Sequence, residues 1–469
     1  MDLSNKIISE SKKFVCLLSI ITLTLFNNAV LRVIKDTLLF SDNSSIEVVH
    51  FIKSFLVMPI SMVFVYFYTK VSLTVKSNKI IYIIMFSFML FFTLYAFLHP
   101  VRMHLHPDPN SINLLIKNNE HLKWLLILYG SWSNALFYIF SELWSSVALN
   151  LIFWQFANNI NTIKEAKKNY VYFGIFGSLG MVSGGGLVSY LFSSNFQYKI
   201  SLMSIIISIS IVCIILLYKF IFTKVLHNTY DAIEIKPTKS KFKFYDMINI
   251  FIKSKYLRYM MVLVFCYHMT SNLIEVTWKS ILKLSVGNAE SYASYMGIIY
   301  MISGILSILL FYFPKQLMKK ASWRTIAMLI PVSLIVLTTV FYIALFNSGI
   351  YMHIFNKSNL RIIAIIGAIY YICNRFLKYA LFDPIKEIAY IPLGKEERLK
   401  GKAMIDVFGG KLSKATSGYI QALLLMIVPS GNQIYISYYT IYIVVFCMLI
   451  WIISVHNLSY EYEKIATKD

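Results

Sequence analysis

Apolar runs such as residues 199–222, which read KISLMSIIISISIVCIILLYKFIF, decide the fold of this chain. About 20 consecutive, predominantly apolar residues suffice for a helix to cross the hydrocarbon core of a bilayer. Inside lipid every backbone N–H and C=O must find a partner within the structure, so such a run is predicted to be helical. Further runs lie at 14–39, 46–69, 79–98, 122–157, 168–192, 257–283, 291–313, 325–346, 361–391, 402–428 and 434–456. The sequence therefore predicts an all-α integral membrane protein with about twelve transmembrane helices.

The composition also indicates a bilayer rather than water. Of the 469 residues, 58% are hydrophobic and 14% are charged, whereas soluble domains carry about 25% charged residues. The net charge of +22 could suggest a nucleic-acid partner. Most basic residues lie in short loops between the runs, however, which is the pattern of cytoplasmic loops. We therefore expect a multi-pass protein with both termini in the cytoplasm and no nucleic-acid partner.

No metal or cofactor is expected. The five cysteines all lie within apolar runs and form no CxxC pair, so they are predicted to be free, packed thiols. The long outer loop, 99–121, contains four histidines. Their spacing is not helical, and Pro107-Asp108-Pro109 interrupts the segment, so a solvated loop is favoured over a metal site.

The spans are predicted to fall into two related halves. The parts are an N-terminal six-helix half (1–222), a basic cytoplasmic linker (223–256) and a C-terminal six-helix half (257–469). This layout is typical of major-facilitator-like carriers, which rock two halves about a central site. A weak repeat supports it, since Asn28 and Lys35 in the first span have the spacing of Asn272 and Lys279 in the seventh. The run at 122–157 could instead be two short helices.

Ionisable side chains inside the spans are costly in lipid, so each marks a candidate functional position. The cations are Arg32, Lys35, Lys53, Lys279, Arg375, Lys378, Lys386, Lys411 and Lys414, and the carboxylates are Asp36, Glu142, Glu275, Asp383, Glu387 and Asp406. The alternative is structural: ion pairs between helices, or long side chains that reach the interface. It is weakest for Glu142, which is short and lies in an apolar stretch. The surplus of cations predicts an anionic cargo.

A phosphate-bearing solute with a ring fits these residues best. Lysine binds phosphate as a point charge, and Trp144, Trp154 and Trp278 could stack a base. Aromatic residues in spans more often pack or face lipid, and that alternative stays open.

Prolines and glycines mark where the helices bend or approach each other. Pro59 and Asp383-Pro384 are predicted to break or kink their helices and free backbone groups. Gly174, Gly177 and Gly180 form G-x-x-G-x-x-G, followed by three more glycines at 184–186. No strand precedes this motif, so close helix packing is favoured over a phosphate loop.

At these residues the sequence resembles the ATP/ADP translocase family of obligate intracellular bacteria and plastids. The matching segments are Leu31-Arg32-x-x-Lys35-Asp36-Thr37-Leu38, Ser141-Glu142-Leu143-Trp144-x-Ser146-Val147, Phe156-Ala157-Asn158, Glu275-Val276-Thr277-Trp278-Lys279-Ser280, Leu381-Phe382-Asp383-Pro384-Ile385-Lys386-Glu387 with Ala389-Tyr390-Ile391-Pro392-Leu393, and Lys400-Gly401-Lys402-Ala403-x-Ile405-Asp406-Val407. They follow one another in order over nearly the whole chain. The resemblance implies a major-facilitator type of fold, a bacterial inner membrane, and exchange or import of host nucleotides such as ATP, ADP or GTP.

The resemblance also implies which residues bind the substrate or relay the conformational change. The candidate substrate-binding residues are Arg32, Lys35, Asp36, Glu142, Asn158, Ser178, Glu275, Lys279, Lys378, Asp383, Lys386, Asp406, Lys411 and Lys414. Lys386, Lys402, Lys411 and Lys414 compete for one phosphate-binding role. The chain departs from the family pattern at Val33, at Ser178 and in the segment 413–418, which favours a different nucleotide preference from plain ATP/ADP exchange.

Our main hypothesis is a nucleotide carrier that works by alternating access, as a monomer without cofactors. Lys35, Lys279, Lys386 and Lys411 would neutralise phosphates, while Glu142 and Glu275 hold the lysines of the empty site. A GxxxxGK[ST] loop is absent from the sequence, so solute gradients rather than nucleotide hydrolysis would drive it. The alternative is a proton-coupled exporter of small organic ions, in which the two glutamates carry protons. No nucleophile–base pair is recognisable, so an enzyme is not expected.

Overall fold

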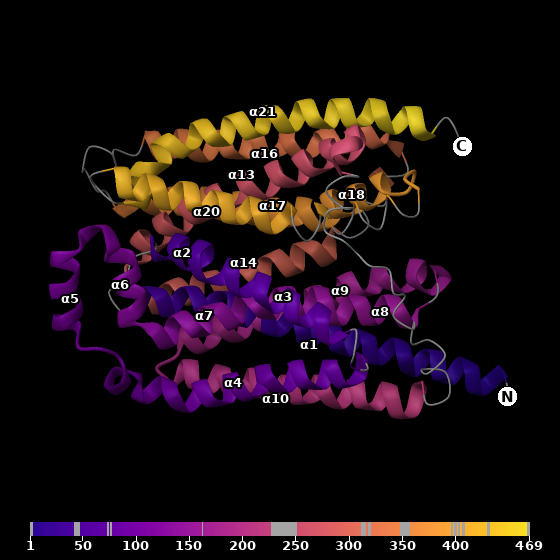
Figure 1. The fold of residues 1–469 in the computed structure, drawn as a ribbon, viewed down its shortest axis with the longest axis horizontal. Coiled ribbons are helices and arrows are strands. Elements are labelled where there is room, and N and C mark those ends of the chain that lie inside the picture. Colours follow the sequence, from indigo (N-terminus) through magenta and orange to yellow (C-terminus); the bar gives the residue numbers. More distant parts are fainter. Residues whose placement is uncertain are drawn as a thin grey trace. The chain divides into compact units, whose positions relative to one another are not determined.

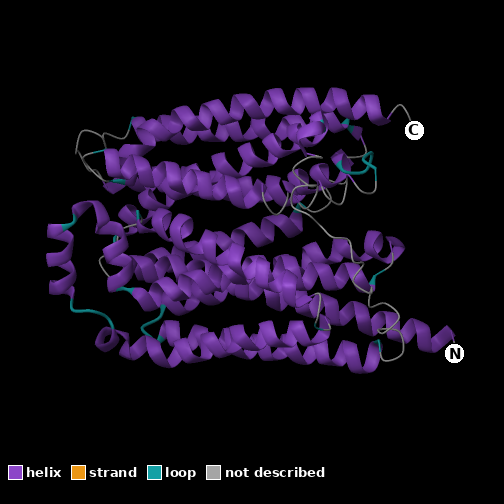
Figure 2. Cartoon of the chain, in the orientation of Figure 1, coloured by secondary structure: helices purple, strands orange, loops and turns teal. Residues whose placement is uncertain are grey.

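The structure is a computed structural model that describes residues 3–41, 47–72, 75, 77–161, 163–226, 251–310, 316–317, 320–347, 357–394, 397, 401, 404–405, 409–428 and 432–466. Within these residues every regular element is a helix (Figure 2). Eleven of the described helices are long and apolar enough to cross a membrane. The predicted all-α membrane architecture is therefore confirmed.

The chain folds into two compact units. Unit 1 comprises Met1–Val48, Phe55–Lys239 and Asn288–Ile308, and unit 2 comprises Val49–Ser54, Ser240–Gly287 and Leu309–Asp469. Each unit thus takes one short segment from the opposite part of the sequence. The predicted division into halves around a linker stays a prediction, and most of that linker, 227–250, lies outside the described residues.

Unit 1 is built around its first helix. Its elements are α1 (Leu3–Ser41), α3 (Met58–Ser72), α4 (Ser77–Leu105), α5 (Pro109–Asn118), α6 (Lys123–Gly130), α7 (Trp132–Trp144), η3 (Ser145–Phe153), α8 (Trp154–Ile160), α9 (Ile163–Ser193), α10 (Lys199–Phe220), η4 (Ile221–Val225) and α14 (Ala289–Leu309). Helix α1 packs along α9, and α4 along α10 (Figure 1). The glycines of α9 permit this, because a Cβ on Gly180 would collide with the Thr22 carbonyl of α1. Helix packing, the favoured role of the glycine motif, is confirmed.

Unit 2 is built around the long helix α13. Its elements are α13 (Lys255–Val286), α16 (Trp323–Phe346), α17 (Lys357–Leu377), η6 (Lys378–Phe382), α18 (Asp383–Ala389), α20 (Gly410–Ile427) and α21 (Gln433–Ala466), together with most of α2 (Val48–Phe51) and the first half of η1 (Ile52–Val57). Helix α13 contacts α21, α17 and α20 (Figure 1). This central position leaves most of its side chains buried.

Two sequence predictions need correction, and the helix found in a third expected span, 402–428, is less apolar than the eleven candidate spans. The run at 122–157 is not one span: α6 ends at Gly130, and the membrane-crossing segment is Trp132–Asn158. The expected loop at 99–121 is largely helical, because Asp108 accepts a hydrogen bond from the Ser111 N–H as the N-cap of α5 and Pro109 occupies the first turn. The expected span at 402–428 appears as α20, which is not among the eleven apolar helices; its buried face includes the polar Ser413, Ser417 and Gln421.

The two prolines predicted to kink helices each follow a π-helical segment. Pro59 is the second residue after η1, and Pro384 is the second residue after η6. In η6 the Asp383 N–H donates to the Lys378 carbonyl, five residues back. Pro384 has no N–H to donate, and its ring would crowd the carbonyl one turn earlier. The wider π turn relieves that clash, so the helix widens where a break was expected.

Candidate functional site

Lys35 lies at the centre of a buried charged cluster in unit 1. Its Nζ is 2.9 Å from the Glu142 Oε1 of α7 and 3.0 Å from Oδ1 of its neighbour Asp36. The same ammonium group lies 3.9 Å from the ring centroid of Tyr138, one turn before Glu142. A lysine in a membrane core requires such partners, because an uncompensated buried charge is strongly destabilising.

The glutamate of this cluster is more accessible than the lysine. The side chain of Glu142 is 27% exposed, whereas that of Lys35 is 5% exposed. The carboxylate therefore lies at the accessible edge of the cluster and the ammonium group lies behind it. An anion that entered here would compete with Glu142 for Lys35.

Unit 2 contains a second lysine–glutamate pair. Lys279 Nζ lies 2.6 Å from the Glu275 Oε1, one turn earlier on α13. Their side chains are 9% and 25% exposed, so again the lysine is the more buried partner. The two pairs sit on the helices that carry the Asn28–Lys35 and Asn272–Lys279 spacing. Their glutamates differ in origin, since Glu142 comes from another span and Glu275 from the same helix.

The tryptophans beside these pairs tie helices together. The Trp144 indole N–H donates to the Thr24 carbonyl of α1, and the Trp278 indole N–H donates to the Ala364 carbonyl of α17. Both rings are fully buried, and Trp278 is stacked on Tyr371 at a centroid distance of 4.8 Å. These contacts leave no face of Trp278 or Trp144 open to solvent, which agrees with packing rather than with stacking of a base.

Three further predicted lysines act electrostatically on His268 in unit 2. Lys378, Lys386 and Lys414 all lie close enough to act on this histidine electrostatically. His268 precedes Lys279 by eleven residues on α13, which corresponds to roughly 16 Å along the helix. His268 and Lys279 therefore lie about three turns apart on α13.

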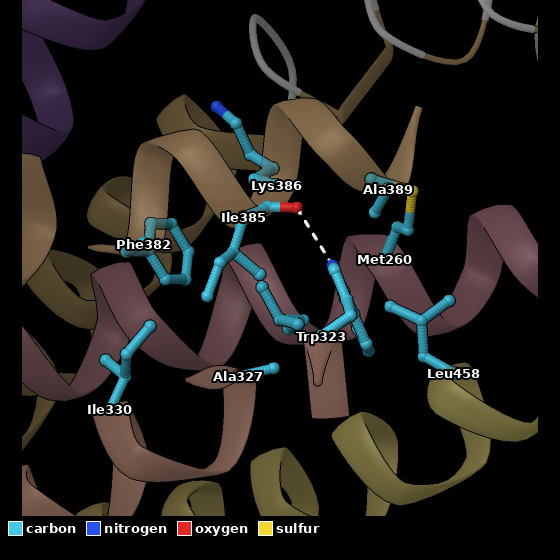
Figure 3. Close-up of a pocket in the computed structure, with 10 residues that line it drawn as sticks. Met260, Trp323, Ala327, Ile330, Phe382, Ile385, Lys386, Ala389 and Leu458 are labelled. Carbon is cyan, nitrogen blue, oxygen red and sulfur yellow. Dashed lines mark hydrogen bonds between the residues drawn. The ribbon is translucent and has the colours of Figure 1, made fainter. Parts of the chain in front are cut away.

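Lys386 points away from the small cavity beside it. The cavity has a volume of about 10 Å³, about one water molecule, and is lined mainly by apolar side chains of α13, α16, α18 and α21. Figure 3 shows the amine of Lys386 directed out of the cluster formed by Phe382, Ile385 and Trp323. The Trp323 indole donates to the Ile385 carbonyl across this cluster at 3.1 Å.

The remaining predicted residues differ in burial and position, and Arg32 lies three residues before Lys35 on α1. Asn158 is exposed near the end of α8, sixteen residues or roughly 24 Å along the helix from Glu142. Ser178 is buried, and its hydroxyl donates to the Gly174 carbonyl of its own helix. Arg32, Asp383 and Lys411 are half-buried. Asp406 and the competing Lys402 lie outside the described residues.

Two neighbours of the site escaped the sequence analysis. Tyr138 faces Lys35, and its spacing of four residues before Glu142 on one helix face could have indicated it. His268 is affected electrostatically by the three lysines, and no motif marks it in the sequence.

Comparison with known proteins identifies the family. The family model described as TLC ATP/ADP transporter matches residues 7–462. The chain belongs to this transporter family. It is 33% identical to ADP,ATP carrier protein 3 of Rickettsia typhi over 97% of this chain and 96% of the relative. It is 32% identical to ADP,ATP carrier protein 1 of Rickettsia prowazekii over 98% of this chain and 95% of that carrier.

Solved structures agree on the fold. A bacterial homologue of the iron transporter ferroportin in its inward-facing state matches with a TM-score of 0.58 and 11% identity, covering 99% of both chains. A variant of the nucleoside transporter NupG matches with a TM-score of 0.52 and 13% identity, covering 97% of this chain and 99% of that one. The predicted all-α transporter fold and the predicted nucleotide carrier are confirmed for this member of the TLC ATP/ADP transporter family. The family does not favour the proton-coupled exporter.

Proposed function

We propose that this chain exchanges nucleoside di- and triphosphates across a bacterial inner membrane by alternating access, with both termini in the cytoplasm and without a cofactor. Lys35 and Lys279 bind phosphate oxygens in this proposal. Glu142 holds Lys35, and Glu275 holds Lys279, when no nucleotide is bound. The related carriers are named for ADP and ATP, which supports adenine nucleotides as the first substrates to test.

The observation that carries this proposal is the pair of buried lysines, each held by a more exposed glutamate. A phosphate oxygen can replace a carboxylate as partner of an ammonium group without leaving the charge uncompensated. When the nucleotide leaves, the glutamate can return to the lysine. The carrier would thus avoid an unpaired buried charge at every stage of its cycle.

The test is uptake of labelled ATP by vesicles that contain the purified protein, with and without ADP inside. We expect internal ADP to stimulate uptake, and a protonophore to have little effect. Lys35→Ala and Lys279→Ala should abolish exchange, because each removes a phosphate partner. Lys199→Ala is the matched control: Lys199 is also a buried lysine, paired with Glu290 at 2.8 Å, and lies outside the predicted site.

Retention of wild-type exchange by both site variants would contradict the assigned phosphate contacts. Absence of uptake for every nucleotide, with any internal nucleotide, would contradict the function itself.

A further inference from the structure

The segment 49–54 carries a charged side chain, Lys53, into unit 2. Residues on either side of this segment belong to unit 1. His50, Ile52 and Ser54 are buried, and Lys53 is half-buried. A cation inside a membrane-crossing helix is costly and marks a candidate functional position. Lys53 was not among the predicted substrate contacts.

Hydrogen bonds fix the segment at both ends. His50 Nε2 lies 2.6 Å from the Gln433 Oε1 of α21, and the Gln433 side-chain amide donates to the Gln421 Oε1 of α20 at 2.9 Å. At the other end, the Tyr419 hydroxyl donates to the Ser54 carbonyl at 2.9 Å. Lys53 lies between these two attachments, so its backbone has a defined position in unit 2.

The fixed segment directs Lys53 to Asn272 of α13. Lys53 Nζ donates to the Asn272 Oδ1 at 3.4 Å. The Asn272 Nδ2 donates to the Ser417 hydroxyl, which in turn donates to the Lys414 carbonyl at 2.8 Å. This chain of donors assigns the orientation of the amide, because Nδ2 is engaged by Ser417 and Oδ1 is left to accept from Lys53.

Asn272 lies on the helix face that carries the proposed phosphate site. Positions 272, 275 and 279 are spaced by three and four residues, so they share one face of α13. From Asn272 to Lys279 the helix rises by roughly 10 Å. Lys53 and Lys279 are therefore placed toward opposite ends of one polar face, a separation that suits an extended chain of phosphates.

We propose that Lys53 is a second phosphate-binding cation of unit 2, one that favours nucleoside triphosphates over diphosphates. The inference rests on the proposed function, since it adds a residue to the site formed by Glu275 and Lys279. In it, Lys279 binds one end of the phosphate chain and Lys53 binds the other. A diphosphate reaches only one of the two ammonium groups.

The experiment compares KM for ATP and for ADP in the vesicle exchange assay. Lys53→Gln should raise KM for ATP by roughly tenfold, as expected for the loss of one charge-assisted hydrogen bond, and leave KM for ADP nearly unchanged. Lys53→Arg retains the charge and should keep the wild-type preference. A purely structural role would change both KM values together and would not distinguish these variants by charge.

Asn272→Asp provides a second variant of nearly the same shape. It places a carboxylate against Lys53, which should compete with phosphate and raise KM for ATP more than KM for ADP. The inference would be overturned if the wild-type protein exchanges nucleotides but the ratio of KM for ATP to KM for ADP is unchanged in Lys53→Gln or in Asn272→Asp. The proposed function would stand in that case. Failure of the wild-type protein to exchange any nucleotide would overturn the proposed function.

Discussion

At the scale of single residues, substitution of Glu142 should have opposite effects on nucleotide binding and on turnover. It holds Lys35 at 2.9 Å and is the more exposed partner. Glu142→Gln removes the negative charge that competes with phosphate, so KM for ATP should fall. Turnover should also fall, because the empty site loses the carboxylate that displaces the product.

Initial rates of exchange over a range of external ATP concentrations measure both effects. Glu290→Gln is the control, since Glu290 pairs with the buried Lys199 in the same unit, outside the proposed site. A Glu142→Gln variant with raised KM and unchanged turnover would contradict competition between carboxylate and phosphate.

The sequence predicted the residues of the charged pairs but not their pairing. Lys35 and Glu142 were recognisable because a charged residue inside an apolar run is visible in the sequence and is costly in lipid. Their contact joins residues 107 positions apart, which helical periodicity does not encode. His268 was missed for the same reason, because the three lysines that act on it electrostatically are more than 100 positions away in the sequence.

At the scale of elements, the contact between α1 and α9 depends on missing side chains. A Cβ on Gly180 would collide with the Thr22 carbonyl, whereas a Cβ on Gly174 of the same helix would meet nothing within 4 Å. Gly180→Ala should therefore destabilise the protein by about 1–3 kcal/mol, the usual cost of overpacking. Gly174→Ala should be neutral or stabilising by up to about 1 kcal/mol, since alanine favours helix.

Thermal unfolding of the two variants in detergent, followed by tryptophan fluorescence, compares them directly. Equal melting temperatures for Gly180→Ala and Gly174→Ala would contradict the close approach of α1 and α9.

The π-helical segment η6 should contribute to turnover rather than to binding. Lys378 is its first residue, and Pro384 lies two residues after its end. Pro384→Ala restores a backbone donor and should let η6 tighten to an α-helix, which turns Lys378 relative to α18. We expect a several-fold lower turnover with little change in KM.

Pro331→Ala is the control, because Pro331 lies inside the continuous helix α16 without a π segment. The same exchange assay measures both variants. Equal loss of turnover in the two variants would indicate a general effect of proline removal rather than a role of η6.

Element types were predictable where a long apolar run decides them, as in α10 and α16. Element types were not predictable where capping residues and prolines decide them. Asp108 and Pro109 look like a break in sequence but form an N-cap and a first turn, which begin α5. The sequence indicated a span at 402–428, but it did not indicate that α20 would bury the polar Ser413, Ser417 and Gln421.

At the scale of the whole molecule, the exchange of segments between the units links the two parts of the chain. Residues 288–308 complete unit 1, where Gly297 of α14 meets Gly185 of α9 so closely that a Cβ on Gly185 would lie 2.5 Å from the Gly297 carbonyl oxygen. Residues 49–54 complete unit 2 through His50 and Gln433. Fragments cut after Lys239 should therefore accumulate in membranes only when co-expressed.

Immunoblotting of membranes measures this, and nucleotide exchange by the co-expressed fragments confirms correct assembly. Gly185→Ala in the first fragment should reduce assembly, whereas Gly186→Ala should not, since its Cβ would meet only the Met301 sulfur at 3.7 Å. If each fragment accumulates alone to the same level as when the two are co-expressed, the dependence of one fragment on the other would be contradicted.

The placement of α14 also sets an order for biogenesis. The ribosome releases residues 1–239 well before residues 288–308, so the nascent unit 1 enters the bilayer with the α14-facing surface of α9 uncovered. At a synthesis rate of about 5–20 residues per second, the wait for α14 lasts on the order of several seconds. During that interval Gly185 and the buried Lys199 lack their native neighbours, and the insertion machinery or lipid must occupy their place.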